Sequence, residues 1–81
     1  MNSNEWTVIG LVRSTGEFEG FTYDNTTFHC SRPANETKGG IGSVVAAFKI
    51  KTNKLDFEPE IGQVISPYFD QFKNVDYIRL I

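Results

Sequence analysis

The sequence has one cysteine, one histidine and no long apolar run, and each shortage excludes a class of protein. Cys30 has no partner for an intramolecular disulfide, which excludes a small secreted scaffold held together by disulfides. No stretch approaches the ~20 apolar residues of a membrane-spanning helix, and the Met1–Glu5 segment lacks the features of a signal peptide. We therefore expect a cytoplasmic protein that does not associate with a membrane.

The same shortages argue against catalysis. His29 and Cys30 are adjacent, so in a strand their side chains point to opposite faces and cannot form a nucleophile–base pair. A second histidine, which a metal site with Cys/His spacing would need, is missing. The carboxylates around Pro59 are typical of a solvated acidic loop. We expect no enzymatic activity, no metal and no cofactor.

Basic charge is also scarce. Eight Lys and Arg residues stand against ten Asp and Glu residues, which gives a net charge of −2. This balance excludes a strongly basic nucleic-acid clamp, although a local basic strip remains compatible with it. The length of 81 residues predicts one domain over 1–81 with a small core, and dimerisation would help such a domain to fold.

Aromatic residues are abundant by comparison. They make up 14% of the chain, including seven Phe. A core of this size cannot easily enclose all of these rings, so we expect some of them at the surface, where they contribute to binding. Trp6, Phe28 and Phe48 are best explained as core residues.

Short β-rich runs separated by turn residues account for most of the chain. Val44, Ala46, Phe48 and Ile50 alternate with polar or small residues and should share one face of a strand. We expect Ser14–Glu17 to break the first run, Asp24–Asn25 to form a bulge or tight turn, and Ser31–Gly42 to form a long loop. The predicted strands are residues 6–13, 18–30, 44–50, 63–69 and 75–81.

Five strands without a strong helix predict an all-β fold, a small, partly closed barrel of the oligonucleotide/oligosaccharide-binding (OB) type. An SH3-like barrel has the same number of strands and is the alternative. Closure would cover the edge strands, which in a sheet rich in aromatic residues would otherwise pair with other chains.

Surface rings next to basic side chains suit single-stranded nucleic acid, whose bases stack on rings while phosphates follow a basic track. Phe72 and Lys73 fall in a predicted hairpin tip at Asp70–Asn74. Lys49 and Lys51 should share the solvent face of the third strand, and Arg79 should lie on that of the last. Phe57, in a connector next to Pro59, fits a core or a surface position equally well.

Four segments carry a family resemblance: Gly20–Tyr23 (followed by Cys30), Phe48–Ile50, Phe57–Pro59 and Asp76–Leu80. In residues and order they resemble the single-stranded-DNA-binding proteins of filamentous phages, which are small OB-like homodimers of similar length. The resemblance implies an origin in a phage, plasmid or other mobile element.

The resemblance also implies individual roles. Tyr23 would be a DNA-facing ring, Lys49 a phosphate contact and Phe57 an aromatic residue of the binding region. Phe72 would be the ring of the terminal hairpin, which in the family also builds the dimer, and Arg79 a basic residue of the last strand. The chain departs from the family in its first hairpin, where Glu17, Phe18 and Glu19 stand in place of arginines, and at Tyr77, in place of a second basic residue.

Two hypotheses follow from the sequence. The first is a homodimeric protein that binds single-stranded DNA, or RNA, without sequence preference. The second is a small β-barrel module that uses its aromatic surface to bind a protein and binds no nucleic acid. Under the first hypothesis the binding residues are Tyr23, Lys49, Lys51, Phe57, Phe72, Lys73 and Arg79.

Overall fold

A computed structural model describes residues 4–35 and 38–81, and the fold is all-β, as predicted. Its five strands form one antiparallel sheet in the order β3-β2-β1-β4-β5. A 3₁₀ turn, η2 (Thr52–Lys54), follows the third strand. The strands are β1 (Trp6–Phe18), β2 (Phe21–Pro33), β3 (Ser43–Lys51), β4 (Val64–Phe69) and β5 (Val75–Leu80).

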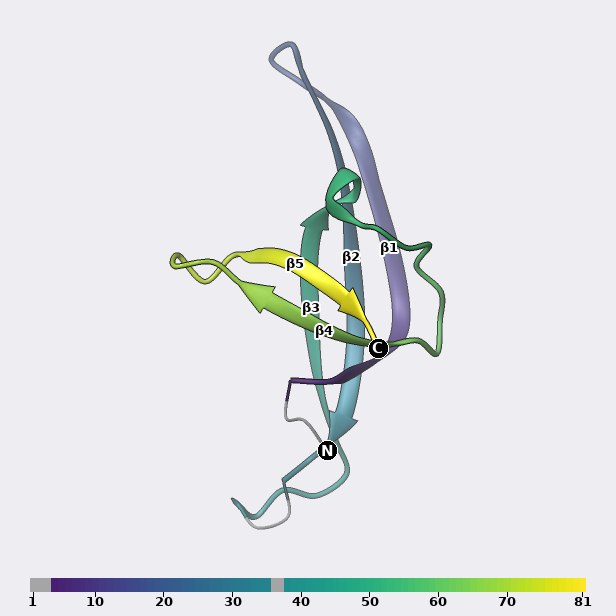
Figure 1. The fold of residues 1–81 in the computed structure, drawn as a ribbon, viewed down its shortest axis with the longest axis vertical. Coiled ribbons are helices and arrows are strands. Elements are labelled where there is room, and N and C mark those ends of the chain that lie inside the picture. Colours follow the sequence, from purple (N-terminus) through teal and green to yellow (C-terminus); the bar gives the residue numbers. More distant parts are fainter. Residues whose placement is uncertain (1–3, 36–37) are drawn as a thin grey trace.

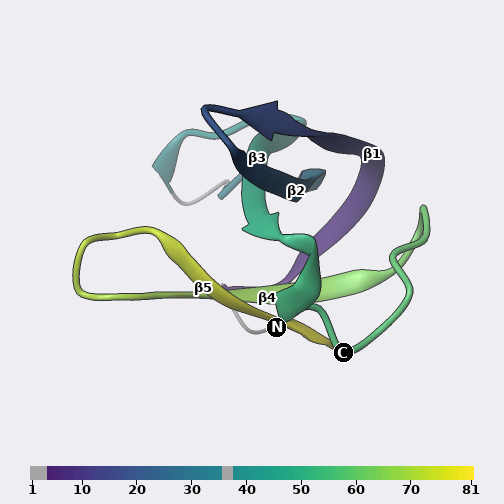
Figure 2. The same ribbon diagram turned by 90° about the horizontal axis from the view of Figure 1, so that it is seen from above.

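The sheet curls into two layers. The β4–β5 hairpin crosses the long strands β1, β2 and β3 at a steep angle and lies on one side of them (Figures 1 and 2). The start of β1 joins the layers, because Trp6 and Thr7 pair with Ile65 and Val64 of β4. The layers are thus parts of one continuous sheet.

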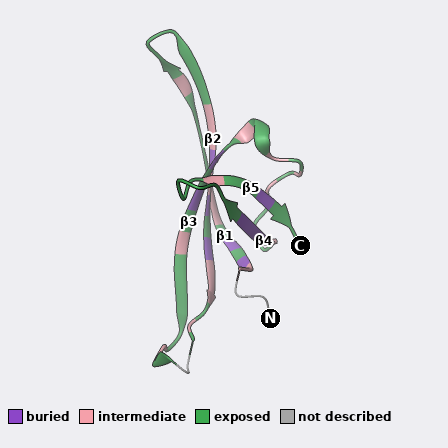
Figure 3. Ribbon diagram, turned by 60° about the vertical axis from the view of Figure 1, so that its left-hand side comes forward, coloured by how far each residue is buried: buried purple, intermediate pink, exposed green. Residues whose placement is uncertain are grey.

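The core fills the space between these layers. Its rings include Trp6, Phe28 and Phe48, as predicted, and Trp6 meets Phe48 edge to face at 5.3 Å between ring centroids. Where the long strands cross the β4–β5 layer, alternation places every second side chain in this space, as at Trp6 and Val8 of β1 and at Phe48 and Ile50 of β3. In Figure 3 the buried residues gather where the layers cross, and the ends of the β1–β2 and β4–β5 hairpins are exposed. The buried apolar residues are Trp6, Val8, Phe28, Cys30, Phe48, Ile50, Ile65 and Ile78.

The predicted barrel closure is not confirmed. β3 and β5 are the two edge strands of the sheet, and they approach each other across the core. Among the described residues, however, no strand pairing joins β3 to β5, so the sheet stays open. The long strands project beyond the core instead of wrapping around it, and the molecule measures 49 × 27 × 19 Å.

The predicted break at Ser14–Glu17 is wrong. β1 continues through these residues, and the turn falls at Glu19 and Gly20, whose φ values are +50° and +81°. Positive φ at both central residues, with Phe18 paired to Phe21, defines a type I′ two-residue hairpin. Gly20 supplies a backbone conformation that β-branched residues avoid, which places the turn here.

Two further predictions near this hairpin need correction. Asp24 and Asn25 pair regularly with Thr15 and Ser14, and the irregularity of this ladder lies between Val8 and Gly10 instead. The loop expected from Ser31 begins later, because β2 continues to Pro33 in register with β3. Residues 36–37 of that loop lie outside the described part of the chain.

The second hairpin tip is where the sequence predicts it. The carboxylate of Asp70 accepts hydrogen bonds from the backbone N–H groups of Phe72 and Asn74, at 2.8 and 3.0 Å. Lys73 adopts a positive φ of 64°, which reverses the chain between β4 and β5. Asp70 therefore organises the turn through its own side chain.

Candidate nucleic-acid interface

One face of the β1–β2–β3 layer points away from β4 and β5, and we call it the outer face. On β2 the side chains that alternate with buried Thr26 and Phe28 lie on it, and they include Tyr23. The register pairs Lys51 with Asn25 and Lys49 with Thr27, so both lysines share this face with Tyr23.

Tyr23 lies over Gly16, its cross-strand neighbour on β1. A Cβ atom at Gly16 would fall 2.4 Å from the phenol oxygen, 2.6 Å from Cζ and 2.9 Å from Cε1 of Tyr23. The ring thus occupies the space that a side chain at position 16 would fill, and Tyr23 is still 43% exposed. A ring supported by backbone and open to solvent is the arrangement on which a nucleic-acid base stacks.

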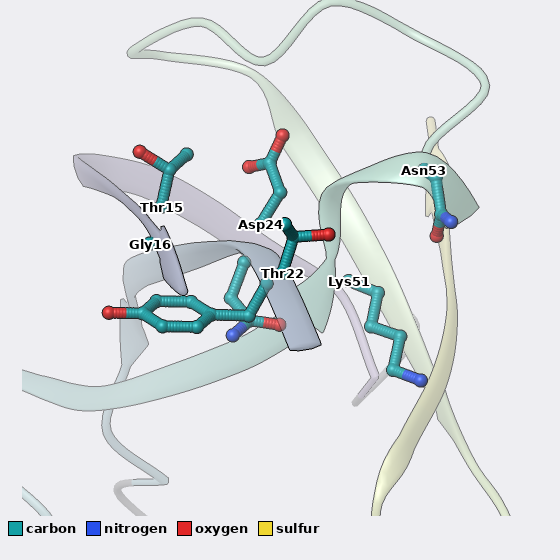
Figure 4. A pocket seen from close by; sticks show the side chains of 8 residues that line it. Thr15, Gly16, Thr22, Asp24, Lys51 and Asn53 are labelled. Atoms are coloured by element: carbon teal, nitrogen blue, oxygen red, sulfur yellow. The ribbon is translucent and has the colours of Figure 1, made fainter. Parts of the chain in front are cut away.

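A hollow next to this ring extends toward the end of β3. Figure 4 shows Gly16, Thr22 and Asp24 on the hairpin, facing Lys51 and Asn53 across the hollow. The amides of Asn25 and Asn53 add hydrogen-bonding groups to its lining. The hollow therefore combines a ring, an ammonium group, amides and the carboxylate of Asp24, which is paired with Arg13.

Lys49 and Lys51 line a second hollow, which separates β3 from the tip of the β4–β5 hairpin. Lys54 also lines it, but its ammonium group is 3.3 Å from the carboxylate of Asp76. Within residues 4–35 and 38–81, neither Lys49 nor Lys51 forms an ion pair. Their charges are available to an incoming anion.

Side chains on the inner face fix the base of the hairpin that carries Tyr23. The guanidinium of Arg13 donates two hydrogen bonds to the carboxylate of Asp24, at 2.9 and 2.6 Å. The hydroxyl of Thr52 donates to the same carboxylate at 2.8 Å and lies 2.8 Å from the hydroxyl of Thr26. Hydrogen bonds from Arg13 and Thr52 lower the pKa of Asp24, and the bond to Asp24 raises the pKa of Arg13. This network ties η2 to the hairpin.

The other predicted site residues lie elsewhere. Phe72 is 73% exposed and stands with Lys73 at the tip of the β4–β5 hairpin, a projection separate from the first hairpin (Figure 1). Phe57 is half-buried, and its ring centroid lies 6.2 Å from that of Phe28. It lines a hollow on the inner face of the β1–β2–β3 layer. Arg79 is exposed on β5, where it pairs with Ser66 and points away from the core. The structure thus groups Tyr23, Lys49 and Lys51 and separates them from the remaining residues.

The sequence prediction missed the rings at the first hairpin tip. Phe18 and Phe21 are paired across the turn and are 70% and 78% exposed. They share the outer face with Tyr23, since the register alternates from Phe21 to Tyr23 along β2. The sequence pattern that could have predicted these rings is Glu19-Gly20 between two phenylalanines, because a two-residue turn at this position places both rings at the hairpin tip.

A further aromatic pair lies on the far side of the β4–β5 layer. Tyr68 and Tyr77 stack at 6.1 Å, and the hydroxyl of Tyr77 donates to Asp56 at 3.0 Å. The hydrogen bond to Asp56 raises the pKa of Tyr77. Tyr77 is therefore held by the protein itself, which makes it a less accessible ring than Tyr23.

Reactive groups are few in the described chain. Cys30 is fully buried, and burial raises the pKa of its thiol to about 11, which keeps it in the unreactive thiol form at neutral pH. Among the residues that the structure describes, no group of three or more His, Cys, Asp and Glu side chains could hold a metal ion. The described helical structure contains no segment long and apolar enough to span a membrane.

Comparison of the chain with protein-family models, with curated proteins and with solved structures found no match.

Proposed function

We propose that this protein binds single-stranded DNA without sequence preference and catalyses no reaction. The observation that carries the proposal is the Tyr23 ring over Gly16, on the same sheet face as Lys49 and Lys51. The ring would stack a base, and the two ammonium groups would hold the adjacent phosphates. The OB-like character of the sheet, a homodimer and a cytoplasmic location belong to the same proposal.

The free energy of base stacking is large enough for a site with few rings. Stacking of a base on an aromatic ring contributes about 1–3 kcal/mol, so Tyr23 together with one or two further rings supports useful affinity. Phe18 and Phe21 extend the aromatic surface along the same face toward the tip. Phe72, Lys73 and Arg79 would contact more distant nucleotides, whereas Phe57 would support the fold through Phe28.

Charge limits the expected affinity. Glu17 and Glu19 stand next to the aromatic tip, and the chain as a whole is acidic. These carboxylates repel each phosphate that the lysines attract. Salt screens both the repulsion and the attraction. We expect binding of moderate affinity that weakens steeply as the salt concentration rises.

Anisotropy of a labelled oligo-dT, titrated with protein at several salt concentrations, tests the proposal. Lys49→Ala should weaken binding equally for all sequences and reduce the slope of log K against log salt by about 0.7, the loss of one phosphate contact. Lys38→Ala, a change of an exposed lysine in the loop before β3, is the matched control and should leave the slope unchanged. No saturable binding by the folded protein at low salt would refute the proposal.

A protein-binding module is the second candidate, and the exposure of Phe18, Phe21 and Phe72 favours it. Exposed phenylalanines at hairpin tips fit an apolar pocket of a protein partner as well as they fit bases. The oligo-dT titration separates the candidates, since a folded protein without nucleic-acid affinity leaves this one standing.

A further inference from the structure

His29 is the one histidine of the chain, and it is exposed on the outer face. It pairs with Gly10 of β1 on one side and with Ala47 of β3 on the other. A hydrogen atom and a methyl group can neither hydrogen-bond to an imidazole nor cover it. Within the described residues the His29 side chain makes no hydrogen bond and no ion pair, so both of its ring nitrogens are open to a ligand.

The outer face around His29 carries no carboxylate. The described strand segments that form this part of the face contain one acidic residue, Asp24. Its side chain belongs to the inner-face network, where it is paired with Arg13. The chain is acidic as a whole, but this part of its surface carries only basic charge. The segments are Gly10–Gly16, Tyr23–Ser31 and Val45–Lys51.

The basic groups of this face lie along one line. Lys49 is opposite Thr27, two residues along β2 from His29, which makes it a diagonal neighbour of the imidazole. It is the nearest charged side chain of β1 and β3 on this face, and β4 and β5 lie on the opposite side of the layer. From Tyr23 to His29 the line is about 20 Å long, at about 3.3 Å per residue. A nucleic-acid strand that follows it meets the Tyr23 ring, Lys51, Lys49 and the imidazole in that order.

We infer that His29 is a third cation of this site, charged only in acid, so that the protein binds single-stranded DNA more tightly as the pH falls. The inference rests on the proposed function and adds a residue and a pH response to it. Histidine ordinarily changes its charge between about pH 5 and pH 8. In the charged form both ring nitrogens donate, and an N–H group next to Lys49 holds a further phosphate oxygen. Loss of the proton removes the charge and with it one phosphate contact.

Other titrating side chains do not account for such a response. The pKa of Asp24 is lowered by its hydrogen bonds, and the pKa of Tyr77 is raised. Burial raises the pKa of Cys30 to about 11. All three move away from the range in which histidine titrates. The α-amino group titrates near this range, so the response has to be assigned by replacing the histidine.

Anisotropy of a labelled oligo-dT, measured at about pH 8 and at about pH 5.5 in low salt, tests the inference. The unmodified chain should bind about three- to tenfold more tightly at the lower pH. The slope of log K against log salt should steepen there by about 0.7, the gain of one phosphate contact. Thymine and the phosphodiester keep their charges over this range, so the change belongs to the protein.

Two substitutions separate the charge of His29 from its place in the fold. His29→Gln has no charge at either pH, and it should show the weaker affinity and the shallower slope at both. His29→Lys is charged at both, and it should show the tighter affinity and the steeper slope at both. Urea unfolding should give both variants a midpoint close to that of the unmodified chain, because the side chain is exposed. A pH response that persists in His29→Gln overturns the inference, as does a His29→Lys chain that gains no affinity at the higher pH.

Lys49→Ala is the comparison on the adjacent strand. It should weaken binding at both pH values and keep the pH response, because His29 is still present. A response that disappears in this variant counts against His29 as its source. Saturable binding with the same affinity and slope at both pH values overturns the inference and leaves the proposed function standing. No saturable binding at either pH refutes the proposed function, and the inference with it.

Discussion

Replacement of Gly16 by alanine should displace the Tyr23 ring without unfolding the protein. The new Cβ would fall 2.4 Å from the phenol oxygen and 2.6 Å from Cζ. Carbon–carbon contact needs about 3.5 Å, so the ring has to move by about 1 Å or rotate to another rotamer. The ring is the end of a side chain that is 43% exposed, so it can move into solvent.

The expected effect on stability is small. Gly16 lies in the extended backbone of β1 and does not adopt a positive φ, so an alanine fits the backbone at this position. Alanine also reduces the entropy of the unfolded chain, which stabilises by about 0.4–1 kcal/mol and offsets part of the cost of moving the ring. Urea unfolding should therefore give a midpoint close to that of the unmodified protein.

The expected effect on oligo-dT binding is large. Loss of one stacked base costs about 1–3 kcal/mol, which corresponds to a 5- to 150-fold weaker affinity. Tyr23→Ala should weaken binding by a similar factor. In the Tyr23→Ala background the added Gly16→Ala change should alter the affinity by less than about twofold, because the ring it displaces is already gone.

Gly10→Ala is the matched control on the same strand, since its Cβ would meet only His29, at 3.3 Å. This variant should bind oligo-dT as the unmodified protein does. The reasoning is refuted if Gly16→Ala binds normally while Tyr23→Ala is weakened, or if the two changes add in the double variant.

Three other predictions concern stability and reactivity. Phe28→Ala should lower the free energy of unfolding by about 3–5 kcal/mol in urea titrations, because Phe28 is fully buried; a loss below 1 kcal/mol contradicts the core assignment. The pKa of Asp24 is lowered from 3.8, so its hydrogen bonds stabilise the fold above pH 3.8, and this stabilisation is lost as the pH falls through the pKa of Asp24 in the folded protein. Asp24→Asn should therefore destabilise the protein at pH 7 but not at a pH below that pKa. Equal destabilisation at both pH values contradicts this prediction. Cys30, with a pKa of about 11, should resist thiol reagents at pH 8 until the protein unfolds; rapid labelling of the folded chain contradicts burial.

Several features of the fold follow from local patterns and were predictable. Alternation along residues 44–50 correctly placed Phe48 and Ile50 in the core, and the Asp70–Asn74 turn was predicted from its residue types. The first turn was misplaced, because Ser14–Glu17 and Glu19-Gly20 both contain turn-forming residues. Cross-strand pairing decided between them, since only the second turn aligns Phe18 with Phe21 and keeps the ladder in one register from Gly10 to Phe18.

The candidate site was predictable only in part. Strand alternation assigned Lys49 and Lys51 to exposed positions, because it is a local property of the chain. The exposure of the Tyr23 ring was implied only by the family resemblance. The pattern could not show that Tyr23 lies over Gly16 or that Phe57 packs against Phe28. These contacts join residues distant in sequence, and their geometry depends on strand register and length, which arise only when the whole sheet forms.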